Sequence, residues 1–371
     1  MRHFLFLTAL LVLCATTFSH AAAAPKVTLT DKIDQMIMIG FNGTTVAKNS
    51  DIENILKNTN IGGVLLFDYN SQTKTYGKNI VTAPQLTTLN KSLQAKARTP
   101  LFIAIDEEGG QVSRLKRFPG FIPLKSAAAL GTTTANNVLV QNTALAKTLK
   151  SLGVNTNFAP VLDLTSTNKN APLTKQQRTF SKNPTTVAAY ASAVIKGMNS
   201  SSIIPVGKHY PGIGEAVIDT HKGLATITTH TDSALQPYKI LVAQQTLPAV
   251  MVGHVLDKSV DPLLPASLSP THINILRNTI GFTGVIFTDD LDMGAITEKY
   301  STGPAVVAAV KAGVDVVVIS NNITTYNPSA FFEARNAILT AVKNKQLTEA
   351  RINESYERIM KLKAPLFPTK Q

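Results

Sequence analysis

The sequence predicts an α/β fold: one (β/α)8 barrel of the TIM type. Eight short apolar runs follow one another along the chain, each as long as a strand and rich in Val, Ile, Leu or Phe. Such runs are typical of parallel strands that are buried on both faces. Longer segments with helical spacing separate them, as a barrel requires. The runs are Gln35–Phe41, Gly63–Phe67, Leu101–Asp106, Asn155–Leu164, Ile203–Tyr210, Ala249–Val255, Gly284–Asp290 and Asp315–Ser320.

The segments between the runs carry helix signals. Leucines recur at intervals of three and four residues in Pro84–Ala97 and in Asn137–Leu152. Ser269-Pro270 predicts a helix start, and Gly281 marks the end of that helix. A last helix is expected from Thr348 to Lys363, before Pro365. An open doubly wound sheet is the alternative, but the strand count of eight and the lack of a G-x-G-x-x-G motif after the first strand favour the barrel.

The first 24 residues predict a secretory signal peptide, followed by a single catalytic barrel over residues 25–371. A short basic start precedes the apolar run Leu5–Cys14, and small residues of the A-x-A type follow near Ala22–Ala24. The run is shorter than the ~20 apolar residues of a spanning helix. A lipoprotein is the second alternative because of Cys14, but Leu13 stands where lipoprotein signals carry a small residue. We expect an exported protein, periplasmic or secreted, without a stable membrane anchor.

Composition narrows the classes of partner. The 371 residues carry a formal net charge of +13, which suits contact with an anionic cell envelope but equally suits solubility alone. The lysines are scattered and aromatic residues make up only 6%, which argues against nucleic-acid binding. Cys14 is the single cysteine, so the chain that remains after cleavage has no thiol. That composition suits an oxidising compartment.

Five of the eight apolar runs end in, or directly precede, charged or imidazole side chains. Barrel active sites lie at these carboxyl ends, so we expect a functional cluster there. Spacing alone does not separate Asp289 from Asp290, and His254 either lines the site or is a packed structural histidine. The charged and imidazole side chains at the ends of these runs are Asp106, Asp163, Lys208-His209, His254 and Asp289-Asp290.

Three motifs carry the chemistry. Asp106 begins a run of three acids before Gly109-Gly110, which allow a sharp turn; Asp106 is placed to accept hydrogen bonds from hydroxyl groups, whereas the next two acids are interpreted as solvated or structural. Asp219 and His221 lie two residues apart in a loop that opens with Pro-Gly-x-Gly and is expected to be mobile. Such a pair serves as an acid/base near neutral pH, although a surface pair or a zinc site has the same spacing. Asp289 is placed as a carboxylate nucleophile.

Together these stretches resemble glycoside hydrolase family 3, in its single-domain β-N-acetylglucosaminidase branch. The resemblance runs from about Asp31 to Leu366 and rests on stretches that begin at Asp106, Lys208, Asp219 and Thr288, with Gln177–Ser181 and Leu264–Ser269 in addition. The chain departs from the branch pattern at Glu107, Gln111, Ile213 and Asp292. An insertion, Asp68–Thr82, follows the second strand and is expected to add a wall to the cleft.

The resemblance implies a retaining β-N-acetylhexosaminidase that acts on peptidoglycan fragments or chitooligosaccharides. It implies Asp289 as nucleophile and His221, oriented by Asp219, as acid/base. No cofactor or metal is expected, because a carboxylate and an imidazole suffice. A β-glucosidase or β-xylosidase of the family and an inactive cell-wall binding protein are the alternatives. The residues implied to grip the sugar are Asp106, Arg114, Arg178, Lys208 and His209, with His254 as a further candidate.

Overall fold

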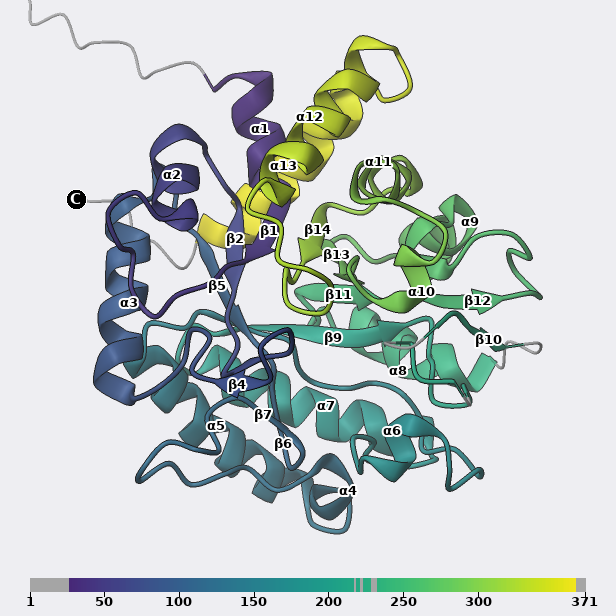
Figure 1. Ribbon diagram of the computed structural model, residues 1–371. Helices are drawn as coiled ribbons and strands as arrows, with labels where there is room; N and C mark the ends of the chain where they lie inside the picture. The colour runs from purple at the N-terminus through teal and green to yellow at the C-terminus, as the bar shows by residue number, and fades with distance from the viewer. Residues whose placement is uncertain (1–26, 217, 221–222, 228–231, 365–371) are drawn as a thin grey trace, which may run out of the picture.

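The computed structural model describes residues 27–216, 218–220, 223–227 and 232–364. Eight parallel strands form a closed barrel, in which β1 pairs with both β2 and β14 (Figure 1). Every barrel strand lies inside one of the apolar runs, so the predicted fold is confirmed. The predicted signal peptide lies outside the described residues. The barrel strands are β1 (Ile37–Gly40), β2 (Gly63–Leu65), β5 (Phe102–Ile105), β8 (Thr156–Asn157), β9 (Ile204–Tyr210), β11 (Ala249–Val252), β13 (Val285–Asp290) and β14 (Val316–Ile319).

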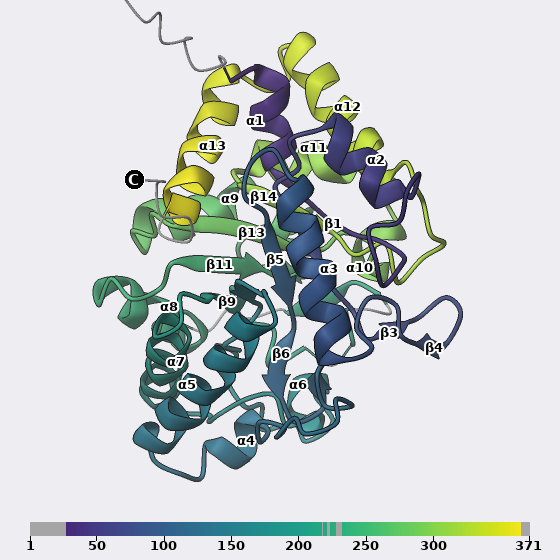
Figure 2. The ribbon, with the colours of Figure 1, turned by 90° about the vertical axis from the view of Figure 1, so that its left-hand side faces the viewer.

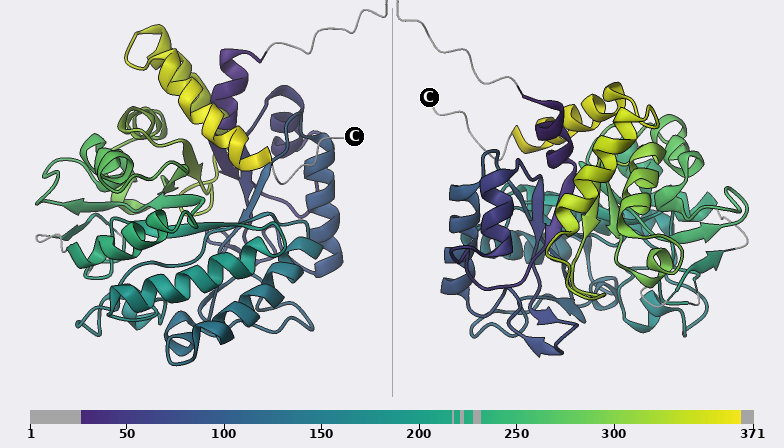
Figure 3. Two further views of the ribbon diagram at one scale, coloured as in Figure 1. Left: turned by 180° about the vertical axis from the view of Figure 1, so that it is seen from behind. Right: turned by 45° about the horizontal axis from the view of Figure 1, so that its top comes forward.

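Helices surround the barrel (Figure 3). Three of them begin close to the predicted starts: Thr82 caps the amino terminus of α3, Ser269 that of α9 and Thr348 that of α13, each through its side-chain oxygen. After α9 the chain continues as a π-helix, Ile275–Thr279, and Gly281 follows with φ of 80°. The α-helices are α1 (Leu29–Gln35), α2 (Asp51–Asn58), α3 (Ala83–Lys96), α4 (Ala127–Leu130), α5 (Ala135–Ser151), α6 (Pro172–Lys175), α7 (Pro184–Asn199), α8 (Asp232–Ala243), α9 (Pro270–Asn274), α10 (Gly294–Thr297), α11 (Thr302–Ala312), α12 (Ala330–Lys343) and α13 (Glu349–Lys363).

In the part of the chain that the structure describes, three short two-stranded sheets lie outside the barrel. The inserted segment forms the antiparallel hairpin of β3 (Tyr69–Asn70) and β4 (Thr75–Tyr76), which projects from the body (Figure 2). A second hairpin joins β6 (Glu107–Gly109) to β7 (Val112–Ser113), and β10 (Ala225–Ile227) pairs in parallel with β12 (Val255–Asp257). Gly109 and Gly110 make the expected sharp turn, with φ of 92° and 56°.

Aromatic rings fill the barrel interior. Phe287 packs edge-on against Phe102 and Phe158, with centroids 5.7 and 5.8 Å apart. Phe158 also borders the pocket described below, so the aromatic packing forms part of the pocket floor. No helix within the described residues has the length and apolarity needed to cross a bilayer.

Charged side chains close the amino-terminal end of the barrel. Lys363, at the end of α13, is buried and donates to the Gln35 side chain and to the Gly62 carbonyl, both at 2.7 Å. Its ammonium lies 4.4 Å from the centroid of the Phe102 ring. Burial lowers the pKa of Lys363 well below its usual value. The last helix therefore seals the barrel opposite the site.

Candidate active site

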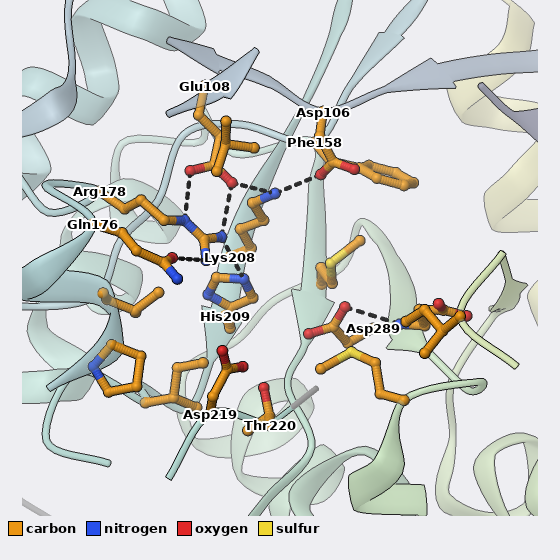
Figure 4. A pocket seen from close by; sticks show the side chains of 18 of the residues that line it. Asp106, Glu108, Phe158, Gln176, Arg178, Lys208, His209, Asp219, Thr220 and Asp289 are labelled. Atoms are coloured by element: carbon orange, nitrogen blue, oxygen red, sulfur yellow. Dashed lines mark hydrogen bonds and ion pairs between the residues drawn. The ribbon is translucent and has the colours of Figure 1, made fainter. Parts of the chain in front are cut away.

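A pocket of about 290 Å³ opens at the carboxyl ends of the barrel strands (Figure 4). This volume lies at the lower end of the ~300–1,000 Å³ typical of small-molecule sites, which suits one sugar unit. All but two of the sequence-predicted site residues line it: His221 lies outside the described residues, and His254 lies elsewhere. The predicted residues at the pocket are Asp106, Arg114, Arg178, Lys208, His209, Asp219 and Asp289.

One wall of the pocket is a charged lattice built on β5, β6 and β9. Lys208 Nζ lies 2.7 Å from Asp106 Oδ1 and 2.7 Å from Glu108 Oε1. Arg178 donates two hydrogen bonds of 2.8 Å to Glu108, in a bidentate pair. Arg114 holds the other oxygen of Asp106 at 3.3 Å. These contacts hold hydrogen-bond donors and acceptors at fixed positions along the pocket wall.

The lattice keeps its carboxylates ionised. Burial alone would raise the pKa of Glu108, but Arg178 and Lys208 outweigh it and lower the pKa to about 2. Burial opposes ionisation of Asp106 as well, but Lys208 and Arg114 hold its pKa well below the usual range. The same carboxylates raise the pKa of Lys208 against the effect of burial. The wall therefore carries fixed charges throughout the neutral range.

His209 is oriented from behind by Asp163. The Asp163 carboxylate accepts hydrogen bonds from His209 Nδ1 at 2.8 Å and from two backbone amides, those of His209 and Ile213. His209 Nε2 faces the Arg178 guanidinium at 3.4 Å. Since a guanidinium only donates, this arrangement fits the neutral tautomer with the proton on Nδ1. Asp163 thus acts on the site through His209 rather than from the pocket surface.

The structure distinguishes Asp289 from Asp290. Asp289 is half-buried and its carboxylate points into the pocket (Figure 4). Asp290 Oδ1 instead accepts from the backbone amides of Ser320 at 2.7 Å and Asp292 at 3.1 Å. Burial and the neighbouring Asp292 raise the pKa of Asp290 to about 8. Asp290 therefore fixes the adjoining loops, and Asp289 is the carboxylate presented to a ligand.

The loop from Pro211 onward brings Asp219 to the same pocket. Asp219 is half-buried, lines the pocket and points into it, with Thr220 beside it (Figure 4). His221 lies outside the described residues, so the Asp219–His221 pair and the distance of its imidazole from Asp289 stay predictions. Glu215, in the same loop, is exposed and accepts a hydrogen bond of 2.9 Å from the Ser166 hydroxyl; it is not among the residues that line the pocket.

His254 does not lie in the pocket, which corrects its candidacy as a binding residue. It is fully buried, with Nδ1 2.7 Å from the Ser267 hydroxyl and Nε2 2.9 Å from the Asp290 carbonyl. The chain leaves β11 at Val252, so His254 falls on the link to β12 rather than on the strand end. His254 is therefore a packed structural histidine, which was the second of the two interpretations that the sequence allowed.

Sequence reasoning missed several residues of the pocket. Glu108 was interpreted as solvated or structural, but the period of two along β5 and β6 places it beside Asp106, with Glu107 on the opposite face. That alternation was the available signal. Gln176, Tyr69, Ser71 and Asn322 also line the pocket, and the last three join the predicted insertion wall to the loop after β14. Within the described residues, no group of three or more His, Cys, Asp or Glu side chains is arranged to hold a metal.

The buried carboxyl group of Glu107 is expected to make the stability of the folded chain depend on pH. Burial raises the pKa of Glu107 to about 7, against an ordinary value of 4.5, although amides of Leu115 and Arg114 donate to its carboxylate. Between these values the folded chain holds a proton that the unfolded chain releases, so its contribution to stability falls as pH rises from 4.5 to 7. Glu107→Gln removes this titration. The stability of the variant relative to the parent chain is therefore expected to be greater at pH 8 than at pH 5, by up to ~3 kcal/mol.

Denaturant unfolding of Glu107→Gln and the parent chain at both pH values measures this difference. The exposed Glu357→Gln is the matched control and is expected to change neither value. An equal stability gain at pH 5 and pH 8 would contradict the assignment of a buried protonated carboxyl.

A (β/α)8 barrel with a charged pocket at its strand ends is a framework that glycoside hydrolases use, among other enzymes. The model of the Glycosyl hydrolase family 3 N terminal domain matches residues 28–362, and the chain belongs to this family.

The chain is similar to proteins named as beta-hexosaminidases and to a solved structure of the family. It is 30% identical to Beta-hexosaminidase A of Pseudoalteromonas piscicida, over 94% of this chain and 63% of that protein. It is also 30% identical to Beta-hexosaminidase LpqI of Mycobacterium tuberculosis, over 90% of this chain and 82% of that protein. The solved family 3 β-N-acetylglucosaminidase from a Paenibacillus species superposes with a TM-score of 0.82 at 31% identity, over 91% of this chain and 62% of that one.

Proposed function

We propose that the protein is a retaining β-N-acetylhexosaminidase that removes terminal β-linked N-acetylglucosamine. The observation that carries this proposal is a pocket large enough for a single sugar. The Asp289 carboxylate lines this pocket together with the charged side chains of Asp106, Glu108 and Lys208. Two relatives named as beta-hexosaminidases support it; the chain spans 63% of the first and 82% of the second. The apolar side chains of Phe158, Met251 and Met293 border the pocket and suit the methyl group of an acetamido substituent.

The roles follow from the chemistry of the groups. Asp289 attacks the anomeric carbon and forms a glycosyl ester while the leaving oxygen takes a proton from His221. His221 then accepts a proton from the water that attacks the ester, which frees the sugar and restores Asp289. Asp219 orients the imidazole in both steps. The reaction as proposed uses no metal or cofactor, and sugar hydroxyls bind to Asp106, Arg114, Arg178, Lys208 and His209.

Hydrolysis of aryl β-glycosides tests the proposed activity. Release of the aryl alcohol from the N-acetylglucosamine derivative, far above release from the glucose and xylose derivatives, is the expected result. Faster hydrolysis of glucoside or xyloside would make the protein a β-glucosidase or β-xylosidase of the same family. If a single-turnover experiment released no aryl alcohol, the proposal would be overturned, and an inactive cell-wall binding protein would be the remaining alternative.

His221→Ala is expected to slow substrates according to their leaving groups. Activated aryl glycosides need little protonation, so their glycosylation step is expected to change little, whereas an N-acetylglucosamine disaccharide is expected to lose ~10²–10⁴-fold in kcat/KM. Deglycosylation loses its base, so a covalent intermediate is expected to accumulate with the activated substrate. Stopped-flow kinetics and intact-protein mass spectrometry measure both effects. Equal slowing of both substrates, with no intermediate, would assign the acid/base role elsewhere.

We also propose that the protein is exported and meets peptidoglycan fragments or chitooligosaccharides outside the cytoplasm. The amino-terminal sequence pattern of residues 1–24 supports export, and the charge of +13 suits contact with an anionic envelope. Amino-terminal sequencing of the secreted or periplasmic protein tests cleavage near Ala24. A protein recovered only with Met1 in the cytoplasm would contradict it.

A further inference from the structure

Four alternate residues run in a line up one side of the pocket. Leu65, Phe67, Tyr69 and Ser71 all line the cavity, as expected where extended backbone sends every second side chain to one face. Their exposure rises in that order: Leu65 is 4% and Phe67 9% exposed, Tyr69 is half-buried and Ser71 is exposed. The series therefore runs from the floor of the pocket to its mouth, and Tyr69 stands near the rim.

The segment after β14 forms the other half of this side. Val318, Asn322 and Ile323 line the pocket and rise in exposure from 1% to 4% to 37%. Asn322 joins the two halves, because its Nδ2 donates to the Tyr69 carbonyl and its Oδ1 accepts from the Ser71 amide, both at 3.2 Å. We call residues 69–71 and 322–323 the rim wall.

A buried cation anchors the rim wall. Lys78 is only 4% exposed, and its Nζ donates to the Asn321 carbonyl at 2.7 Å and to Asn322 Oδ1 at 3.0 Å. On the outer side, the Tyr69 ring packs against Tyr76 with centroids 5.0 Å apart, and the Arg117 guanidinium lies 3.8 Å from the Tyr76 centroid. Tyr69 is therefore held in place from two sides before any ligand arrives, which reduces the entropy lost on binding.

The position of the rim wall decides which part of a substrate it meets. The aromatic floor at Phe158 closes the pocket below, so whatever is attached to the bound sugar beyond the scissile bond has to pass the mouth. Resting on the proposed function, we propose that the rim wall is the subsite for a sugar on the leaving-group side, with Tyr69 as its stacking platform. The exposed Ser71 supplies a hydroxyl for that sugar's polar edge, Asn322 holds the two halves of the wall together, and an aromatic ring suits the sugar's apolar face.

Two substrates separate this subsite from the rest of the pocket. The β-linked N-acetylglucosamine disaccharide fills both positions, whereas β-N-acetylglucosaminyl fluoride has a single atom as its leaving group and cannot reach the rim wall. Tyr69→Ala is expected to lower kcat/KM for the disaccharide about tenfold or more, chiefly through KM, which matches the loss of one stacked ring. The change for the fluoride is expected to be far smaller.

Tyr69→Phe keeps the ring and is expected to retain most of the disaccharide activity. Tyr356→Ala removes a half-buried ring on α13 at the opposite end of the barrel and serves as the matched control, with no change for either substrate. An unchanged disaccharide rate in Tyr69→Ala, or equal losses on both substrates, would overturn the subsite. Failure of the parent chain to hydrolyse either substrate would instead overturn the proposed function, and the subsite with it.

Discussion

Replacement of Asp289 by asparagine is expected to lower kcat for N-acetylglucosaminides by at least ~10⁴-fold, or about 5.5 kcal/mol of transition-state stabilisation. Asparagine has nearly the same shape, and its carbonyl oxygen still accepts from the Asp290 amide, which lies 2.8 Å from Asp289 Oδ1. It cannot form the glycosyl ester, however. The fold is therefore expected to persist while the first chemical step is lost.

Steady-state kinetics and thermal unfolding of the same preparation test this prediction. The matched control is Asp290→Asn, next to it on β13, which lies outside the proposed chemistry because backbone amides hold its carboxylate. It is expected to affect stability more than the chemical step. In the smaller Asp289→Ala variant, added azide is expected to displace the leaving group directly and give the α-glycosyl azide. An Asp289→Asn rate within tenfold of the parent chain would remove the nucleophile assignment.

Lys208→Met is expected to destabilise the folded chain by ~3–5 kcal/mol and to raise KM strongly. The buried ammonium is shared by Asp106 and Glu108, each 2.7 Å away, so its loss leaves two carboxylates facing one another out of water. Their pKa values would no longer be lowered by this cation, and burial would raise them. The stability difference from the parent chain is therefore expected to be smallest near pH 4 and to grow as pH rises above the ordinary carboxyl pKa.

Denaturant unfolding of Lys208→Met across this pH range measures the effect. Lys239→Met is the control, because Lys239 pairs with Asp232 on the exposed face of α8 and surface pairs contribute little. A Lys208→Met chain as stable as its parent at neutral pH would mean that the lattice carries no fixed charge.

The barrel and the location of its site were accessible from the sequence because burial and strand position leave a local pattern. Each barrel strand lies within a continuous apolar run, and most of the polar residues at the ends of these runs line the pocket, among them Asp106, Lys208 and Asp289. The choice between Asp289 and Asp290 was not accessible. The pairing of β13 with β14 shifts register between Phe287 and Asp290, so simple alternation does not tell which carboxylate faces inward.

Other parts of the site depend on contacts between distant residues. Glu108 meets Arg178 across 70 positions of sequence, and Tyr69 meets Asn322 across 253. No local pattern records such pairs. His254 shows the opposite error. It lies near the end of an apolar run, as Lys208 and Asp289 do, but its ring is hydrogen-bonded to Ser267 and the Asp290 carbonyl instead of lining the pocket.

The seal at the amino-terminal end of the barrel has a consequence for how the molecule is made. Lys363 joins Gln35 across 328 positions, and β14 closes the circle on β1. A ribosome delivers β1 first and α13 last, so β1 presents an unpaired edge for almost the whole of synthesis. Until β14 emerges and pairs with β1, the nascent chain is an open sheet with an apolar interior. A chain shortened by only its last helix still has β14 to close the barrel, but it lacks the Lys363 seal, so the amino-terminal end of its barrel would stay uncovered and would be exposed to chaperones and proteases.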